Sequence, residues 1–260
     1  RSSLDAARAA GGRVRVVTSP SQALSFAGKT PEEEFIFLAV GFETTVPSTA
    51  VAIRQAAEQD LRNLSFFTSH RTVPSALNAL TMDNQTDIHG FLLPGHVSAI
   101  IGRTPYLFLS EKNVPGTITG FEALDILLGI SELLTMIAEH RAEITNMYPR
   151  AVRENGNPKA LEIINTVFDP CTAVWRGIGE IENTGLKINK KYARFDAARK
   201  YSIRTGKTEM PEGCACGEVL RGRIPPSQCP LFGTRCVPDD PVGPCMVSTE
   251  GSCAAYYKYG

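Results

Sequence analysis

Cysteine is distributed very unevenly in this chain of 260 residues. Six of its seven cysteines fall between residues 214 and 253, in a tail rich in glycine and proline that shows no hydrophobic periodicity. Such a tail cannot bury enough apolar surface to fold alone, so it needs a staple. The candidates for that staple are the thiols of Cys214, Cys216, Cys229, Cys236, Cys245 and Cys253.

The start of the chain bears on what these sulfurs do. The first residues, RSSLDAARAAGG, contain no apolar signal-peptide centre and do not begin with methionine. We therefore expect a cytoplasmic protein whose natural N-terminus is missing. In a protein of that compartment, clustered cysteines favour metal or redox chemistry over a disulfide framework.

The cysteine spacing leaves the identity of the bound group open. Paired Cys-x-x-Cys knuckles, the usual sign of zinc, are absent. Wide, uneven gaps suit an iron–sulfur cluster somewhat better, because its larger body can be held from separate loops. Zinc and unliganded thiols stay open as alternatives. Cys171 lies apart from the others, and we interpret it as a buried thiol.

Charge and hydropathy argue against two classes of partner. Lysine plus arginine and aspartate plus glutamate both number 27, so the net charge is zero. Such a balance predicts no nucleic acid partner. No run of sequence approaches the roughly 18 to 20 apolar residues that a membrane span needs, so we also expect no membrane partner.

The sequence before the tail has an α/β pattern. Apolar runs typical of buried strands alternate with helical stretches, which predicts a doubly wound, mainly parallel sheet. The expected strands are 13–19, 34–40, 64–69, 89–94 and 116–120, and the expected helices include 48–59, 122–141 and 157–168. The leucines of 122–141 gather near one helix face. Asn157 is the expected cap of the last helix.

A β-hairpin is expected after these helices. Residues 173–189 are predicted to form two strands, and the turn between them is placed at Asn183-Thr184-Gly185.

Polar side chains follow several of the predicted strands. Glu43 stands in GFETT, His70 and Arg71 in SHRT, His96 in PGHVS and Glu122 in GFEALD. Ligands of open α/β sheets bind where the carboxyl ends of strands converge, and these residue types supply acids and bases. For any one of them a helix cap or a solvated loop position is the simpler interpretation. Their occurrence at equivalent positions favours a site.

Several strings, taken together and in order, resemble one known family. They are GFETT.P, PGHVS..IG, GFE.LD.L, WRG.G.I, CGEVL.G...P..CPLFG..C and MVS.EG.CAA. The chain closely resembles the HypD family, the maturation proteins of [NiFe] hydrogenases, from its first residues to its last. The resemblance implies two α/β domains of similar build and a small, irregular C-terminal domain that carries a [4Fe–4S] cluster.

The resemblance also implies site residues. The cluster thiolates of the family pattern match Cys216, Cys229, Cys236 and Cys253, and Cys214 is close enough to Cys216 to be a substitute ligand. Cys214 and Cys245 themselves fall outside the pattern. Glu43, His96 and Glu122 become candidates for the active cleft between domains.

The implied function is a maturation scaffold with a redox cluster rather than a conventional enzyme. In a complex with HypC, an iron atom acquires cyanide and carbon monoxide ligands, and HypE donates the cyanide. The finished Fe(CN)2CO unit passes to the hydrogenase large subunit.

The family's upstream motifs, Cys-Gly-Gly-His-Thr-His and Gly-Pro-Gly-Cys-Pro-x-Cys, are absent from these residues. We therefore expect a fragment with a first-domain remnant, an α/β domain with the cleft motifs, a linking region of helix plus hairpin, and the cluster domain, at 1–22, 23–150, 151–200 and 201–260.

Two other interpretations stay open. The first is a zinc-stapled α/β enzyme, hydrolase-like, that uses Glu43 and His96. The second is a module whose main role is to dock HypC.

Overall fold

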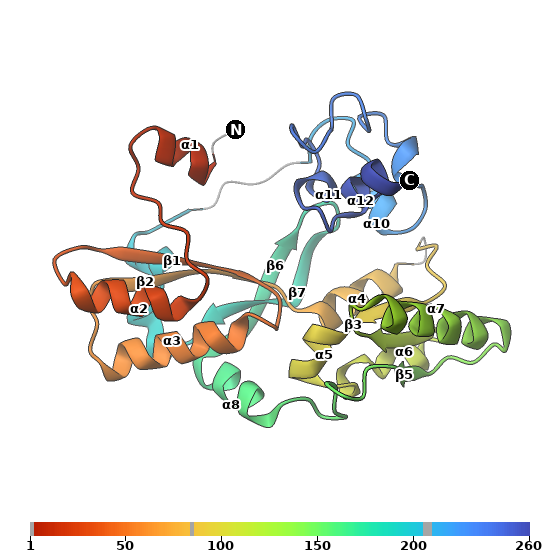
Figure 1. Ribbon diagram of the computed structural model, residues 1–260, viewed down its shortest axis with the longest axis horizontal. Helices are drawn as coiled ribbons and strands as arrows, with labels where there is room; N and C mark the ends of the chain where they lie inside the picture. The colour runs from red at the N-terminus through yellow and green to blue at the C-terminus, as the bar shows by residue number, and fades with distance from the viewer. Residues whose placement is uncertain (1–2, 84–85, 205–209) are drawn as a thin grey trace.

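The computed structural model describes residues 3–83, 86–204 and 210–260. Residues 1–2, 84–85 and 205–209 of the predicted segments 1–22, 23–150 and 201–260 lie outside the described residues. The chain is an α/β protein with parallel sheets. Two lobes, each with its own apolar core, are joined to a cysteine-rich segment by one long hairpin (Figure 1).

The first lobe is assembled from two separate stretches of chain, 20–70 and 158–200. Its strands β1 and β2 are parallel and pair from Phe35↔Leu64 to Gly41↔His70. Helix α3 packs against α8, which belongs to the later stretch, and both contribute to one core. The elements are α2 (Pro20–Lys29), β1 (Phe35–Gly41), α3 (Val46–Glu58), β2 (Leu64–His70), α8 (Pro158–Val167), β6 (Phe168–Trp175), β7 (Gly179–Ile188), η2 (Lys190–Phe195) and α9 (Ala197–Lys200).

The second lobe, residues 73–152, lies between those two stretches in the sequence. Its parallel sheet has the order β3-β4-β5 and packs around a core that includes Tyr106 and Ile118. The elements are α4 (Val73–Met82), β3 (Phe91–Pro94), α5 (Gly95–Ile101), η1 (Thr104–Tyr106), α6 (Phe108–Glu111), β4 (Gly116–Thr119), α7 (Ala123–Ala138) and β5 (Ile144–Asn146). Residues 23–150 thus contribute to two cores, and the predicted domain boundaries stay a prediction.

The antiparallel strands β6 and β7 reach from between the lobes to the cysteine-rich segment, residues 210–260 (Figure 1). That segment consists of loops and short helices packed around its cysteines. The helices are α10 (Cys216–Leu220), η3 (Pro226–Gln228), α11 (Pro244–Val247) and α12 (Ser252–Tyr259). Near the N-terminus, α1 (Leu4–Ala9) buries none of its residues.

Most of the predicted elements are confirmed. Strands 34–40, 64–69, 89–94 and 116–120 correspond to β1, β2, β3 and β4 within two residues, and the helix 122–141 corresponds to α7. The strand predicted at 13–19 is wrong, because these residues adopt no regular structure. No described strand pairs with this run, so its backbone groups lack a sheet partner.

The hairpin prediction placed the reversal wrongly. The chain turns at residues 176–178, where Gly177 has φ +87°, and not at Asn183-Thr184-Gly185. Asn183 does adopt a left-handed conformation, with φ 57°, but it lies inside β7. Thr184 is buried and its hydroxyl accepts a hydrogen bond from Trp175 Nε1 at 2.9 Å. This contact keeps the irregularity within the strand.

The apolar face of α7 points outward. Leu124, Leu127, Leu128 and Leu134 are between 44% and 66% exposed, while the helix buries Asp125, Gly129 and Met136. The apolar pattern predicted the helix correctly, but it did not indicate which side faces the core. None of the described helices combines the length and the hydropathy that crossing a membrane requires.

The predicted cap of α8 is confirmed and gives a stability test. Asn157 Oδ1 accepts hydrogen bonds from the backbone N–H groups of Lys159 and Ala160, at 3.1 and 3.2 Å. Replacing Asn157 with alanine leaves both donors without this acceptor and should lower the free energy of unfolding by about 1 kcal/mol. Lys159→Ala, in the same first turn, is the control and should change it by less than about 0.5 kcal/mol. Urea unfolding measures both, and equal effects would contradict the capping role.

Candidate functional site

The cysteine-rich segment brings all six of its cysteines into one cluster of side chains. Cys216 and Cys245 form a disulfide, with their Cα atoms 6.4 Å apart. The other four have free thiols: Cys229, Cys236 and Cys253 are buried, and Cys214 is partly buried. Two populations of sulfur therefore share one small core.

Backbone N–H groups point at two of the free thiols. Ala215 donates to Cys229 Sγ at 3.5 Å, and Val242 and Gly243 donate to Cys236 Sγ at 3.3 and 3.5 Å. Gly243 must be glycine, because a Cβ there would lie 2.6 Å from Cys214 Sγ. These backbone donors stabilise negative charge on the sulfurs of Cys229 and Cys236.

The thiols also lie close enough to influence one another. Burial, together with the nearby thiols of Cys229, Cys236 and Cys214, raises the pKa of Cys253 to about 11. Burial likewise raises the pKa of Cys214, with added effects from Cys229 and Cys236. Ionisation of Cys214 and Cys253 is therefore unfavourable without a compensating positive charge.

The sequence-predicted ligands fall into both populations. Cys229, Cys236 and Cys253 belong to the group of free thiols, whereas Cys216 is bound in the disulfide. Cys214, considered as a substitute, is the fourth free thiol of the group. Sequence reasoning gave Cys245 no role, and spacing alone held no signal that it pairs with Cys216. Within the described residues, we find no three His, Cys, Asp or Glu side chains placed to hold a single metal ion.

Glu43 is the most unusual carboxyl group of the first lobe. It follows β1 and is only 4% exposed. Its Oε1 accepts a hydrogen bond from the backbone N–H of Val73, at the start of α4, at 2.8 Å, while Oε2 is buried without a partner. Burial raises the pKa of Glu43 to about 7, although its backbone hydrogen bonds oppose the rise. A carboxyl group with this pKa can bind or release a proton near neutral pH.

His70 ends β2, opposite Gly41; it was one of the polar strand-end residues that favoured a site, but not one of the three candidate cleft residues. It is 1% exposed, and neither ring nitrogen has a hydrogen-bond partner. Its ring packs edge-on against Phe168, with ring centroids 5.7 Å apart. Burial, together with the charge of Arg71, lowers the pKa of His70 to about 4. The ring is therefore neutral at ordinary pH. In the sequence, His70 could be recognised by its position directly after an apolar strand.

Tyr106 connects the interior of the second lobe with Glu43. Its hydroxyl is buried and lies 3.4 Å from Ser98 Oγ, which donates to the carbonyl of Pro94 at 2.8 Å. Burial raises the pKa of Tyr106, and the nearby carboxyl of Glu43 contributes to the rise. Glu43 therefore faces the boundary between the lobes.

His96 and Glu122 lie at the strand ends of the second lobe. His96 is exposed and stacks on Phe121, with ring centroids 4.5 Å apart. Glu122 precedes α7 and lies 3.4 Å from Arg150, which holds Asp125 more tightly through a hydrogen bond of 2.8 Å. Sequence reasoning missed Arg150.

The structure does not bring the three predicted cleft residues, Glu43, His96 and Glu122, into direct interaction. Among the described residues, no hydrogen bond or ion pair links Glu43 to His96 or to Glu122. The strand ends of two separate sheets carry them, and a single sheet had been expected. A hydrolase that uses Glu43 and His96 as a pair therefore gains no support from this arrangement.

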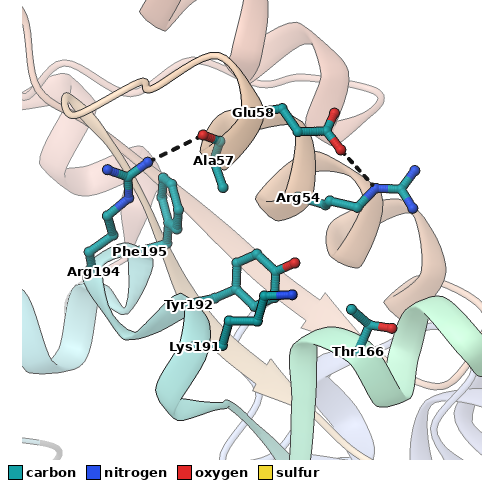
Figure 2. A pocket seen from close by; sticks show the side chains of 8 residues that line it. All are labelled: Arg54, Ala57, Glu58, Thr166, Lys191, Tyr192, Arg194 and Phe195. Carbon is teal, nitrogen blue, oxygen red and sulfur yellow. Dashed lines mark hydrogen bonds and ion pairs between the residues drawn. The ribbon is translucent and has the colours of Figure 1, made fainter.

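A surface pocket of about 530 Å³ lies apart from all of these residues, between α3, α8 and η2 (Figure 2). Its lining includes Lys191, Tyr192 and Arg54, whose guanidinium is 3.5 Å from Glu58. Arg194 turns toward the carbonyl of Ala57. None of the predicted site residues contributes to this pocket.

Comparison with known proteins gives consistent matches. A sequence profile described as "HypD: Hydrogenase formation hypA family" matches residues 1–260. The hydrogenase maturation factor HypD of Rhodobacter capsulatus is 44% identical over 264 residues, which cover 99% of this chain and 70% of that protein. The hydrogenase expression/formation protein HupD of Azotobacter chroococcum is 41% identical over 267 residues, 100% of this chain and 70% of its own length. The hydrogenase maturation factor HypD of Cupriavidus necator is 40% identical over 266 residues, with coverage of 99% and 70%.

Proposed function

The chain belongs to the HypD family, and from this membership we propose that it acts in hydrogenase maturation with a [4Fe–4S] cluster held in its cysteine-rich segment. The single observation that carries the cluster assignment is the group of four free thiols inside one small core. Four thiolates are what such a cluster requires. The positive irons would offset the burial and the neighbouring thiols that raise the pKa of Cys214 and Cys253.

The proposed ligands are Cys214, Cys229, Cys236 and Cys253. The family resemblance had implied Cys216 in place of Cys214. A sulfur in a disulfide offers no thiolate, and Cys216 is bonded to Cys245. Cys214 therefore takes the fourth position in the proposal.

The cluster would supply one-electron chemistry. The residues around it would hold its sulfurs and set its potential through hydrogen bonds, which stabilise the more negative, reduced state. The N–H groups of Ala215, Val242 and Gly243 already point at two of the four thiols. They are the groups we expect to tune the cluster.

The proposal extends to the partners that the family resemblance implies. HypC would form the scaffold complex and HypE would donate cyanide, while the iron of the Fe(CN)2CO unit is the cargo delivered to the hydrogenase large subunit. Glu43, His96 and Glu122 stay the candidate cleft residues. Among these, Glu43 has the most direct support, because its pKa of about 7 suits proton transfer. The proposal retains a cytoplasmic location.

Metal analysis of the chain, purified without oxygen, tests the cluster. We expect a brown protein with about four iron and four sulfide per chain. A colourless protein that holds one zinc and no sulfide would refute the cluster and favour the zinc-stapled alternative.

Co-purification with tagged HypC tests the partner assignment separately. We expect the chain to elute with HypC, and recovery of the cluster without HypC binding would refute only the partner assignment. The same pull-down addresses the interpretation as a docking module, because a chain that lacks iron but binds HypC would fit that role instead.

A further inference from the structure

The tip of the β6–β7 hairpin reaches the cysteine-rich segment (Figure 1), where Gly177 lies next to Cys216 of the Cys216–Cys245 disulfide. At Gly177 a Cβ would lie 3.3 Å from Cys216 Sγ and 3.3 Å from the backbone nitrogen of Gly217. Gly217 in turn approaches the carbonyl of Gly177 so closely that a Cβ on it would clash. Two glycines thus allow the hairpin backbone to rest on the first turn of α10.

Arg221 fastens the tip in this position. Its Nη1 donates to the carbonyl oxygens of Gly177 and Gly217, at 3.3 and 3.1 Å. Its Nε donates to Asp83 at 2.6 Å, and Asp83 terminates α4 of the second lobe. One guanidinium therefore connects the hairpin tip, α10 and the second lobe.

The disulfide beneath this tip is closed off from solvent. Cys216 is 2% exposed and Cys245 is 6% exposed. A thiol that attacks a disulfide must reach one of its sulfurs, so access limits the rate of exchange. Gly177 lies against Cys216, Arg221 holds the hairpin tip on α10, and both cysteines are buried. We therefore propose that residues 176–178 are a cover that controls the access of thiols to the Cys216–Cys245 disulfide.

The reaction that the cover controls is thiol–disulfide exchange with a dithiol. One thiolate of the dithiol bonds to one sulfur of the pair, the S–S bond breaks, and the other cysteine leaves as a thiolate with the bonding electrons. The second thiol of the reagent then displaces the remaining cysteine. The reagent ends as a cyclic disulfide, and the protein gains two electrons and two thiols.

The residue next to the cover contacts the loop that carries Glu43. Trp175, the last residue of β6, packs against Phe42 with ring centroids 6.2 Å apart. Phe42 directly precedes Glu43 in the sequence. A displacement of this loop would therefore move Trp175, which directly precedes the cover.

Two glycines at the tip provide a matched pair of variants. Both have positive φ, +87° at Gly177 and +116° at Gly179, so alanine strains the backbone at either position. A Cβ at Gly179 meets nothing within 4 Å, whereas one at Gly177 presses on Cys216 and Gly217. Only Gly177→Ala should therefore lift the cover.

The measurement is the rate at which dithiothreitol opens the disulfide in the folded, anaerobically purified chain. Samples are quenched with a thiol-alkylating reagent, and mass spectrometry follows the peptides of Cys216 and Cys245. We expect Gly177→Ala to react about tenfold faster than the unaltered chain and Gly179→Ala less than about threefold faster. Equal rates in the two variants, a slower reaction of Gly177→Ala, or absence of the disulfide from the unaltered chain would overturn the proposal.

A second pair decides the matter if Gly177→Ala does not fold. Arg221→Lys removes the fork that holds Gly177 and Gly217 without adding bulk, and should also react faster. Arg223→Lys is its control, since Arg223 pairs with Glu218 at 2.8 Å and lies 3.8 Å from Asp83. A rate increase common to both arginine variants, or present in neither, would overturn the cover.

Discussion

Replacing Cys214 with alanine is expected to abolish most of the iron and sulfide bound by the chain, while replacing Cys216 leaves both in place. The reason is the division of sulfurs in the structure, where Cys214 is a free thiol of the group and Cys216 is consumed in a disulfide. The two positions are separated by one residue, so the variants differ little except in which population of sulfur they remove.

Iron and sulfide assays on anaerobically purified variants provide the measurement. From about four iron per chain, Cys214→Ala should fall below about one, because a cluster that loses a thiolate ligand is no longer held securely. Cys171→Ala, on β6 and outside the cysteine-rich segment, is a control that should keep its iron. Iron lost from Cys216→Ala and retained in Cys214→Ala would restore the ligand set implied by the family resemblance.

Glu43 and His70 should make opposite contributions to the pH dependence of stability. The pKa of Glu43 rises from 4.5 to about 7 on folding. The folded chain therefore holds its proton more tightly, and this stabilisation is present below pH 4.5 and lost as the pH rises to 7. The loss amounts to about 3 kcal/mol in the free energy of unfolding.

His70 acts in the other direction because its pKa falls from 6.5 to about 4. Its contribution is present above pH 6.5 and is lost as the pH falls to 4, again by about 3 kcal/mol. Between pH 4.5 and 6.5 the two effects cancel. The unaltered chain should consequently show little net dependence from these groups in that range.

Two variants separate the contributions. Glu43→Gln removes the Glu43 contribution and keeps that of His70. Relative to the unaltered chain, this variant should therefore gain stability as the pH rises from 4.5 to 7. His70→Leu removes the His70 contribution and keeps that of Glu43. Relative to the unaltered chain, it should gain stability as the pH falls from 6.5 to 4. Urea unfolding across this range measures both, and taking differences from the unaltered chain cancels the other titrating groups. Curves that stay parallel to that of the unaltered chain would refute the burial of these two charges.

The sequence predicted local structure well where one physical rule dominates. Apolar runs predicted β1 to β4 because buried parallel strands have no polar face, and Asn157 was recognised as a cap because its side chain satisfies donors in the next turn. The hairpin turn was misplaced because Asn183-Thr184-Gly185 has the residue types of a turn, and Asn183 does adopt a left-handed conformation, but within β7. Only the tertiary contact between Trp175 and Thr184 shows that the strand continues.

The candidate site was harder to predict because it depends on which distant segments meet. The residue types and the strand-end positions of Glu43 and His96 were readable, but their distribution over two sheets was not. The cysteines were recognised as one group. Their division into a disulfide and four free thiols depends on how α10 and α11 pack, and spacing along the chain does not encode that.

The interleaved order of the lobes has a consequence for biosynthesis. The core of the second lobe is complete at Val152, whereas that of the first lobe needs residues as far as Phe195, which lie 43 positions later. At about 5 to 20 residues per second, a translating ribosome takes about 2 to 9 seconds to cover this distance. For that interval β2 lacks the complete packing of β7 and η2, and the apolar surface left exposed is of the kind that chaperones bind.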